Sequence, residues 1–287
     1  MRISSPRGTI LAACLAALTI GAPVHAFDPS AVFSNDEEPA TILRFGYNAL
    51  KEGRVEDAVG AFRFGVERRD LASTWKLARM LQIGEGVPRD DAAAFELFLS
   101  IAERYVTQVP TDEDTPFVSH AIVSVGVFYL NGLPAAGIHP DVRAAEDHFY
   151  RAAALYGDAE AQYRLGWLLR SGRLGRPQGQ AAARWLKLAA RKGHRAAQSE
   201  LGDILFHGDG VHRNRVQGLY LMTRGAMGQT TARLTQRARQ ALEAATPAER
   251  RELSSLLRSG SDGKGAVYGL ELPARNGAAS RPVSATR

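Results

Sequence analysis

The chain has almost no cysteine: Cys14 is the single one among its 287 residues. Cys14 lies within residues 1–26, which have the pattern of a removable signal peptide, so we expect a mature chain without any thiol. Such a chain forms no disulfide, iron–sulfur cluster or zinc finger. Its length lets it bury enough apolar surface to fold without cross-links.

Long apolar runs are missing beyond residue 26. No later stretch approaches the run of about 18 apolar residues that a membrane-spanning helix requires. We therefore expect a soluble protein that is not embedded in a membrane.

Motifs of catalytic sites are missing as well. The sequence has neither His-Glu-x-x-His, which holds zinc, nor Gly-x-Ser-x-Gly, which presents a hydrolase nucleophile. The best metal candidate is His207 with His212, but the acid between them, Asp209, lies between two turn glycines. The Gly-x-Gly-Val turns follow helices, and no Gly-Lys-Ser/Thr follows them, which argues against a phosphate loop. We predict that the protein is not an enzyme and holds no cofactor or metal.

Positive charge exceeds negative charge, but it is not concentrated. The net charge is +6, and removal of Arg2 and Arg7 lowers it to +4. Only short basic clusters such as Arg68-Arg69 occur, whereas nucleic acid binding needs a basic stripe or patch. We expect solvated helix faces for these side chains and no nucleic acid partner.

The first 26 residues have the three parts of a secretory signal peptide. Arg2 and Arg7 supply the positive segment, residues 9–20 supply the apolar segment, and Val24-His25-Ala26 supplies a small-residue cleavage site. We expect cleavage between Ala26 and Phe27 and export to the periplasm.

The alternative is a lipoprotein signal, because Leu11-Ala12-Ala13-Cys14 matches a lipoprotein box. Cleavage before Cys14 would cut the apolar segment in its middle, which argues against this alternative.

The middle of the chain contains a two-helix unit that recurs at a spacing of 36 residues. Ala161-Gln162-Tyr163-Arg164-Leu165-Gly166 superposes on Ala197-Gln198-Ser199-Glu200-Leu201-Gly202, and looser copies are Ser124-Val125-Gly126 and Lys76-Leu77-Ala78. A Gly-rich turn and an Ala-rich helical stretch follow each copy. Self-similarity at this period is typical of a solenoid. It predicts an all-α fold whose main use is to hold other macromolecules.

Helical periodicity and turn residues divide the chain into regions. We expect a signal peptide at 1–26, an extended lead-in at 27–40, about five repeats at 41–229, capping helices at 230–259 and a disordered tail at 260–287. The expected helix pairs are 41–53 with 55–66, 71–83 with 91–105, 117–130 with 141–156, 158–170 with 178–192, and 194–206 with 213–227.

Local signals predict several helix ends. Gly84 or Gly86 can take the left-handed conformation that ends a helix, and Asp90 or Asp91 can cap the next helix. Thr246-Pro247-Ala248-Glu249 combines an N-cap residue, a proline at the first helical position and a capping-box glutamate. We expect that helix to run to about residue 258 and to cover the last repeat.

The repeat pattern resembles that of Sel1-like repeats, which are relatives of tetratricopeptides. The residues that carry the resemblance most fully are Ala161, Leu165, Gly166, Trp185, Ala189, Ala190 and Gly193. The resemblance implies an all-α, right-handed α-solenoid of helical hairpins. It implies little about function, because these repeats serve many adaptor roles.

A closer resemblance is to the ExoR family of exported Sel1-repeat regulators of alphaproteobacteria, over about residues 27–250. The matching stretches include Phe27-Asp28-Pro29, Phe45-Gly46-Tyr47, Trp75-x-Leu77-Ala78-x-Met80, Ala159-Glu160-Ala161-Gln162, Glu113-Asp114-Thr115 and Leu221-Met222-Thr223. The resemblance implies a periplasmic negative regulator that binds the periplasmic domain of a sensor histidine kinase. The resemblance further implies that this regulator holds off the two-component pathway for exopolysaccharide, motility and host-interaction genes. A periplasmic protease would then degrade the regulator, a step that acid promotes.

Candidate partner contacts come from one helix and one loop. Tyr163, Arg164 and Trp167 share a first helix, and aromatic side chains dominate binding energy at interfaces. Asp112, Glu113 and Asp114 join them in the polar loop between the second and third units. For Trp75 and Trp185 a role in the core is the better interpretation.

His120 and His148 are candidate pH sensors, because histidine titrates at mildly acidic pH and both lie inside helices of the third unit. The alternative is that they are ordinary helix-face histidines. Two other functions stay open: a general periplasmic scaffold for envelope or polysaccharide machinery, and a module that binds peptidoglycan or glycan.

Overall fold

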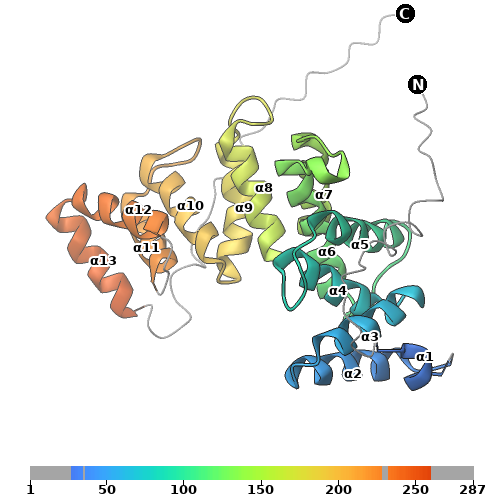
Figure 1. Ribbon diagram of the computed structural model, residues 1–287. Helices are drawn as coiled ribbons and strands as arrows, with labels where there is room; N and C mark the ends of the chain where they lie inside the picture. Colours follow the sequence, from blue (N-terminus) through green and yellow to red (C-terminus); the bar gives the residue numbers. More distant parts are fainter. Residues whose placement is uncertain (1–26, 35, 228–231, 260–287) are drawn as a thin grey trace, which may run out of the picture. The chain divides into compact units, whose positions relative to one another are not determined.

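The protein is all-α (Figure 1). A computed structural model of the chain describes residues 27–34, 36–227 and 232–259. These residues form helices and turns. They contain an isolated β-bridge between Leu133 and Ile138 but no β-strand. The chain divides into two compact units between Asp141 and Val142.

The first unit contains α1 to α6 and a short 3₁₀ helix, η2. Their bounds are α1 Pro29–Val32, α2 Pro39–Lys51, α3 Val55–Glu67, α4 Leu71–Ile83, α5 Asp91–Arg104, α6 Thr115–Asn131 and η2 Pro134–Ala136. The second unit contains α7 to α13. Their bounds are α7 Val142–Leu155, α8 Ala159–Ser171, α9 Gly179–Arg191, α10 Arg195–His207, α11 Arg215–Ala226, α12 Ala232–Glu243 and α13 Pro247–Ser259.

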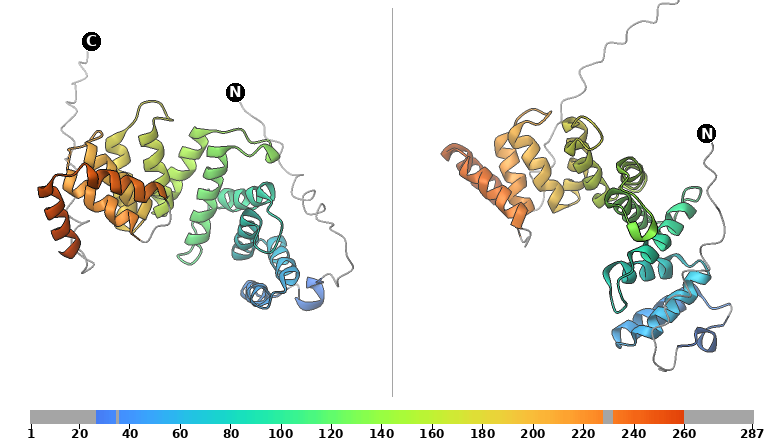
Figure 2. Two further views of the ribbon diagram at one scale, coloured as in Figure 1. Left: turned by 60° about the vertical axis from the view of Figure 1, so that its left-hand side comes forward. Right: turned by 45° about the horizontal axis from the view of Figure 1, so that its top comes forward.

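Four of the expected helix pairs pack as hairpins, namely α2 with α3, α4 with α5, α8 with α9 and α10 with α11 (Figure 2). The expected pair 117–130 with 141–156 falls on either side of the division between the units. The all-α solenoid of helical hairpins predicted from the repeats is thus the observed architecture of each unit. The helix bounds agree closely with the expected ranges, and α4 occupies the expected range 71–83.

Close crossings inside the hairpins depend on glycine. A Cβ atom on Gly202 of α10 would lie 2.7 Å from the carbonyl oxygen of Gly218 in α11, and one on Gly218 would lie 2.6 Å from the carbonyl oxygen of Gly202. Gly166 allows the same approach of α8 to Leu186 of α9. The Leu-Gly pair of the repeat is therefore a packing requirement.

Buried glutamines join two of the repeats, those that begin with α8 and α10, to the helix before them. The Gln162 side-chain amide in α8 donates to the carbonyl of Ala153 in α7 at 3.4 Å. The Gln198 amide in α10 donates to the carbonyl of Ala190 in α9 at 3.3 Å. Both glutamines are almost fully buried, so these contacts satisfy amide N–H groups that water does not reach.

Left-handed residues and Asx caps form the turns. Gly84 has a φ of 72° and ends α4, and the Asp90 carboxylate accepts hydrogen bonds from the N–H groups of Ala92 and Ala93. Gly208 ends α10 in the same conformation, with a φ of 82°. Of the alternatives left open by the sequence, Gly84 and Asp90 are thus the capping residues.

The segment 27–40 is not simply extended as expected. Asp28 caps one turn of helix, α1, by accepting a hydrogen bond from the N–H of Ser30 at 2.9 Å, with Pro29 in the first position. The segment folds back because its aromatic side chains have a core to join: the Phe27 ring lies 5.2 Å from that of Phe45, and Phe33 packs with Phe45 and Phe64.

The helices α12 and α13 follow the last hairpin and pack against α11. The predicted capping box is present: the N–H of Thr246 donates to the Glu249 carboxylate at 2.8 Å, and the N–H of Glu249 donates to the Thr246 hydroxyl at 3.2 Å. The predicted signal peptide with Ala26, and the predicted tail at 260–287, lie outside the described residues.

Across the described ranges, none of the helices is both long enough and apolar enough to cross a membrane.

Candidate interaction surface on the first helices of the second unit

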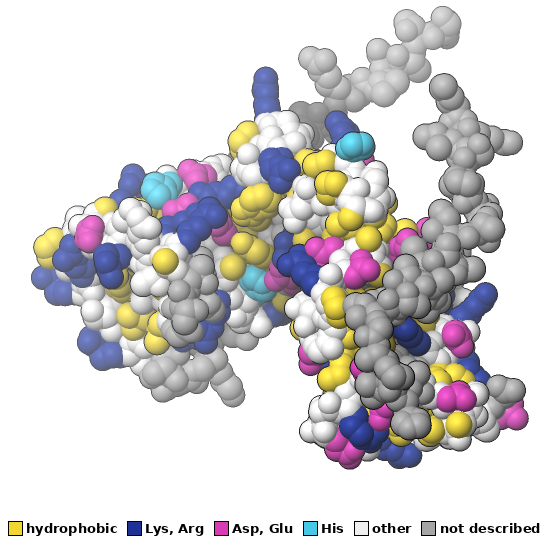
Figure 3. All heavy atoms as spheres, in the orientation of Figure 1, with side chains coloured by type: hydrophobic (Ala, Val, Ile, Leu, Met, Phe, Trp, Pro, Cys, Tyr) yellow, Lys and Arg dark blue, Asp and Glu magenta, His cyan; other side chains and the backbone are white. Residues whose placement is uncertain are grey.

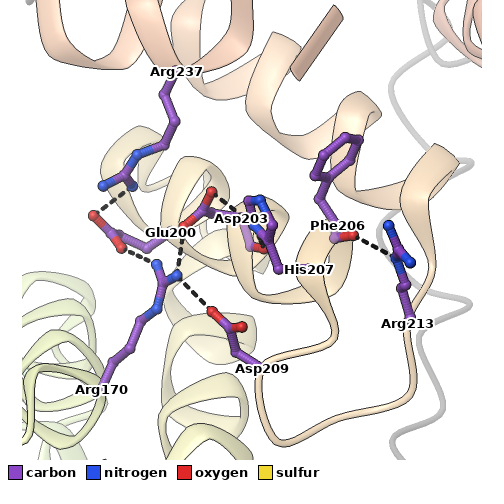
Figure 4. A network of polar contacts seen from close by, with 8 residues as sticks. All are labelled: Arg170, Glu200, Asp203, Phe206, His207, Asp209, Arg213 and Arg237. Atoms are coloured by element: carbon purple, nitrogen blue, oxygen red, sulfur yellow. Dashed lines mark hydrogen bonds and ion pairs between the residues drawn. The ribbon is translucent and has the colours of Figure 1, made fainter. Parts of the chain in front are cut away.

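Arg170, near the end of α8, is the centre of an ion-pair network (Figure 4). Its guanidinium contacts the carboxylates of Glu200 at 2.7 Å and Asp203 at 2.5 Å, both on α10. It also contacts Asp209, in the turn after α10, at 2.9 Å. A planar guanidinium with several N–H donors is suited to holding three carboxylates at once.

Glu200 receives a second arginine from α12. The Arg237 guanidinium donates to the free oxygen of the Glu200 carboxylate at 2.7 Å, so one buried carboxylate is shared by two arginines. Glu200 is 5% exposed, and burial of a carboxylate is costly unless the carboxylate is paired in this way. The network therefore links three helices, because Arg170 of α8 and Arg237 of α12 both pair with Glu200 of α10.

The charges of the network reinforce one another. Burial alone would lower the pKa of the Arg170 guanidinium, but the hydrogen bond and charge of Asp203, with Asp209 and Glu200, outweigh it and raise that pKa. Arg170 therefore stays charged at every pH that the protein meets.

A second cluster lies nearer the start of α8, where Glu160 and Tyr163 contact His194. The Tyr163 ring stacks on the His194 ring with centroids 4.6 Å apart, and His194 is the N-cap residue of α10. Nδ1 of His194 accepts from the N–H of Ala197 at 3.1 Å, and its Nε2 lies 2.8 Å from the Glu160 carboxylate. A neutral imidazole that carries its proton on Nε2 satisfies both contacts.

Arg164 completes this second cluster. Its Nε lies 2.6 Å from the Glu160 carboxylate, and its guanidinium carbon lies 6.0 Å from the centre of the Phe149 ring. Burial would raise the pKa of Glu160, but the hydrogen bond from His194 and the charge of Arg164 outweigh it and lower that pKa. Burial, with the charges of Glu200 and Glu160, raises the pKa of Tyr163.

The predicted contact residues of α8 thus form one surface. Tyr163, Arg164 and Trp167 are all half-buried and present part of their side chains to solvent. Tyr163 is held against His194, and Arg164 is held against Glu160. Fixed aromatic side chains among paired charges are the kind of surface that binds another protein with little loss of side-chain entropy.

The acidic residues predicted to join these contacts belong to the first unit. Asp112 and Glu113 are exposed in the loop between α5 and α6, and Asp114 is half-buried. The structure therefore assigns the predicted contact residues to two surfaces, one in each unit.

Comparison with known proteins agrees with the repeat pattern. A family model of the Sel1 repeat matches residues 71–105, 119–156, 159–194 and 195–229. An exopolysaccharide production negative regulator of Rhizobium meliloti (strain 1021) is 34% identical over 79% of this chain and 82% of its own. The chain belongs to the Sel1-repeat family of such regulators. The regulator of the same description from Rhizobium leguminosarum bv. viciae is 34% identical over 72% of this chain and 75% of its own.

A solved structure supports the fold. The Sel1 repeat protein from Oxalobacter formigenes has a TM-score of 0.55 and 19% identity, and the match covers 83% of this chain and 84% of that one. The family model does not include α2 and α3, yet these helices pack as a hairpin like those of the matched repeats.

The two histidines proposed as pH sensors have different surroundings. His120, on α6, accepts a hydrogen bond at Nδ1 from Trp75 Nε1 at 3.1 Å and packs against the Phe98 ring. His148, on α7, donates from Nδ1 to the carbonyl of Ala144 at 2.8 Å, and burial lowers its pKa. Both are half-buried, and their role as pH sensors stays a prediction.

The sequence interpretation missed the residues that organise the surface, namely Arg170, Glu200, Asp203, Arg237, His194 and Glu160. One signal was available: an acid, Glu200, stands before Leu201-Gly202 where the superposed repeat has Arg164 before Leu165-Gly166. Trp75 packs against Phe117 and His120, and Trp185 packs against Tyr150. Both tryptophans are half-buried rather than fully buried in the core.

In the part of the chain that the structure describes, no three His, Cys, Asp or Glu side chains are grouped so as to hold a metal ion. The Sel1-repeat family and its regulator relatives indicate a protein that acts by binding.

Proposed function

We propose that this protein is a negative regulator of exopolysaccharide production that acts by occupying a partner protein. The observation that carries the proposal is the 34% identity, over 79% of this chain and 82% of the relative, to a protein described as an exopolysaccharide production negative regulator. Sel1 repeats supply the binding surface, and the first-helix face of the second unit supplies fixed aromatic and charged contacts on it.

The partner in this proposal is the periplasmic domain of a membrane sensor histidine kinase. The regulator reaches it through export, for which residues 1–26 have the pattern of a signal peptide. Binding holds the two-component pathway off only if the regulator has a higher affinity for the inactive conformation of the kinase. Proteolysis of the regulator, promoted by acid, then releases the kinase and turns on exopolysaccharide, motility and host-interaction genes.

The histidines give acid a physical point of action. A proton on Nδ1 of His120 displaces the hydrogen bond from Trp75, because both nitrogens then carry hydrogen. Burial lowers the pKa of His148, so the folded state binds a proton there less readily than the unfolded state does. The fold therefore loses stability as pH falls below the ordinary pKa of histidine.

The first test is binding of mature 27–287 to the purified kinase ectodomain at neutral and mildly acidic pH. We expect binding at neutral pH that weakens in acid, and Trp167→Ala is expected to weaken it about tenfold or more. Leu155→Ala, at an exposed position on α7, is the control and is expected to leave binding unchanged.

Two results would count against the proposal. Absence of binding at either pH, with co-purification of polysaccharide synthesis enzymes, would favour a general periplasmic scaffold. Unchanged acid release in a variant with His120→Gln and His148→Gln would remove the histidines from the mechanism and leave the binding function in place.

A further inference from the structure

The outer side of α9 is an apolar strip between exposed arginines. Arg184, Leu188 and Arg191 follow a spacing of four and three residues, which places them on one face of the helix. Trp185 lies beside them and packs edge-on against Tyr150 of α7, with ring centroids 6.0 Å apart. These five residues are called the α9 face.

The α9 face is accessible and has unused charge. Tyr150 is 57% and Leu188 is 41% exposed, whereas Leu186 and Ala190 on the other side of α9 are buried against the hairpin. Neither Arg184 nor Arg191 takes part in an ion pair within the residues that the structure describes. Figure 3 shows hydrophobic side chains flanked by Lys and Arg over the α8–α9 hairpin.

The loop at residues 105–114 of the first unit, called the acidic loop, has the opposite character. It carries two exposed apolar side chains, Val106 at 63% and Val109 at 94%. Asp112 and Glu113 follow them, are exposed, and form no ion pair with any described residue. The loop thus presents apolar groups next to negative charge.

The acidic end of this loop is held in a defined shape. The Thr111 hydroxyl accepts from the N–H of Asp114 at 3.2 Å, and the Thr115 hydroxyl donates to the Thr111 carbonyl at 2.8 Å. Asp112 and Glu113 therefore lie on a turn closed from both sides and anchored to the start of α6. A loop shaped in advance loses less entropy on binding than a loose one.

We propose that the acidic loop of one copy of this protein binds the α9 face of a second copy. Val109 covers Tyr150 and Leu188, and the two acids of the loop pair with the two arginines of the face. The two surfaces have opposite charges, and each has exposed apolar groups that the other can cover. Because the two surfaces differ, the contact is heterologous and is not self-complementary. This inference does not depend on the proposed kinase partner.

The contact is small and partly electrostatic, so we expect weak association. Interfaces below the standard size are typical of weak, transient contacts. Raising the salt concentration weakens the contact, because exposed charges are screened over shorter distances.

Sedimentation velocity of the mature chain alone, over a range of concentrations, tests the proposal. Asp112→Lys with Glu113→Lys reverses the charge of the loop, and Arg184→Glu with Arg191→Glu reverses that of the face. Each double variant is expected to weaken self-association tenfold or more. The matched control, Arg173→Glu with Arg176→Glu, makes the same change at exposed arginines between α8 and α9 and is expected to leave association unchanged.

Mixing the two variants gives the decisive result. The basic face of the loop variant meets the acidic loop of the face variant, so the mixture is expected to associate although neither variant does alone. A wild-type chain that stays monomeric at all concentrations would overturn the proposal. So would a mixture that fails to associate, or a control variant that loses association as the others do.

Discussion

Lys76 in the first unit and Glu200 in the second occupy the same place in their repeats, directly before Leu77-Ala78 and Leu201-Gly202. Both are buried, at 9% and 5% exposure. Lys76 has one acid within reach, the half-exposed Glu85 at 2.9 Å, and its ammonium lies 5.5 Å from the centre of the Tyr47 ring. Glu200 is held between Arg170 and Arg237.

The comparison shows that this repeat position tolerates either sign of charge. What changes with the sign is which helices become tied together. The positive charge of Lys76 is balanced mainly by the turn of its own hairpin, whereas the negative charge of Glu200 draws an arginine from the hairpin before it and another from the helix after it. A single inversion of charge therefore gives the second unit a connection that spans its repeats.

The largest effect is expected from Arg170→Met. The change leaves the buried Glu200 with one arginine and removes the arginine partner of Asp203, so the free energy of unfolding is expected to fall by about 3 kcal/mol. Urea unfolding followed by circular dichroism measures it. The matched change in the first unit, Glu85→Gln, is expected to cost less than about 1 kcal/mol because Glu85 is half exposed. Equal losses in the two variants would mean that the network adds nothing to an ordinary surface pair.

A smaller effect is expected where the helices cross. A methyl group on Gly202 would lie 2.7 Å from the Gly218 carbonyl oxygen and 2.8 Å from the Met222 nitrogen, so α10 and α11 must move apart. Gly202→Ala is expected to cost about 2 kcal/mol. In the first unit the same position is Ala78, fully buried without such a glycine, and Ala78→Gly is expected to cost about 1 kcal/mol.

Thermal unfolding of both variants compares the two crossings. A neutral or stabilising Gly202→Ala would show that the two units cross their helices at the same distance.

The smallest effect is expected from Glu249→Gln, and it depends on pH. Hydrogen bonds from Arg215 and from the N–H of Thr246 lower the pKa of Glu249 from 4.5 to about 2. Because the folded pKa lies below the unfolded one, this carboxylate stabilises the fold above pH 4.5, and the stabilisation is lost as the pH falls toward 2. The variant is expected to be less stable at neutral pH and to lose stability less steeply between these values.

The control for Glu249→Gln is Glu252→Gln, an exposed acid on the same helix. The N-terminal end of the first unit is closed by the aromatic rings of Phe27, Phe33 and Phe45 rather than by charged groups. Phe33→Ala is expected to lower stability without changing its pH dependence. An identical pH profile for wild type and Glu249→Gln would rule out the ionic account of the C-terminal end.

The helices were predictable because their signals are local. The repeat spacing, the left-handed glycines and the capping box each concern residues within a few positions, and Gly84, Asp90 and Thr246 act as expected. The segment 27–40 was expected to be extended, whereas Asp28 and Pro29 start a turn of helix and Phe33 packs against Phe45 and Phe64.

The surface was predictable only in part. Tyr163, Arg164 and Trp167 were selected from residue type and position on a helix, and those signals can be read from the chain. The network around Arg170 joins residues 30 to 39 positions apart, and its partners are chosen by the packing of successive repeats. The role of His194 was hidden for another reason: the N-caps of α4 and α8 are Asp70 and Asp158, and a neutral histidine is an uncommon substitute for them.

The buried glutamines Gln162 and Gln198 bear on how such a chain changes length during evolution. Each one fastens its repeat to the end of the helix immediately before it, and the donor and acceptor recur with the repeat. A duplicated gene segment of one period would therefore encode both the glutamine that donates to the preceding helix and the carbonyl that accepts from the next repeat. The chain can lengthen by one hairpin without a new kind of contact between repeats.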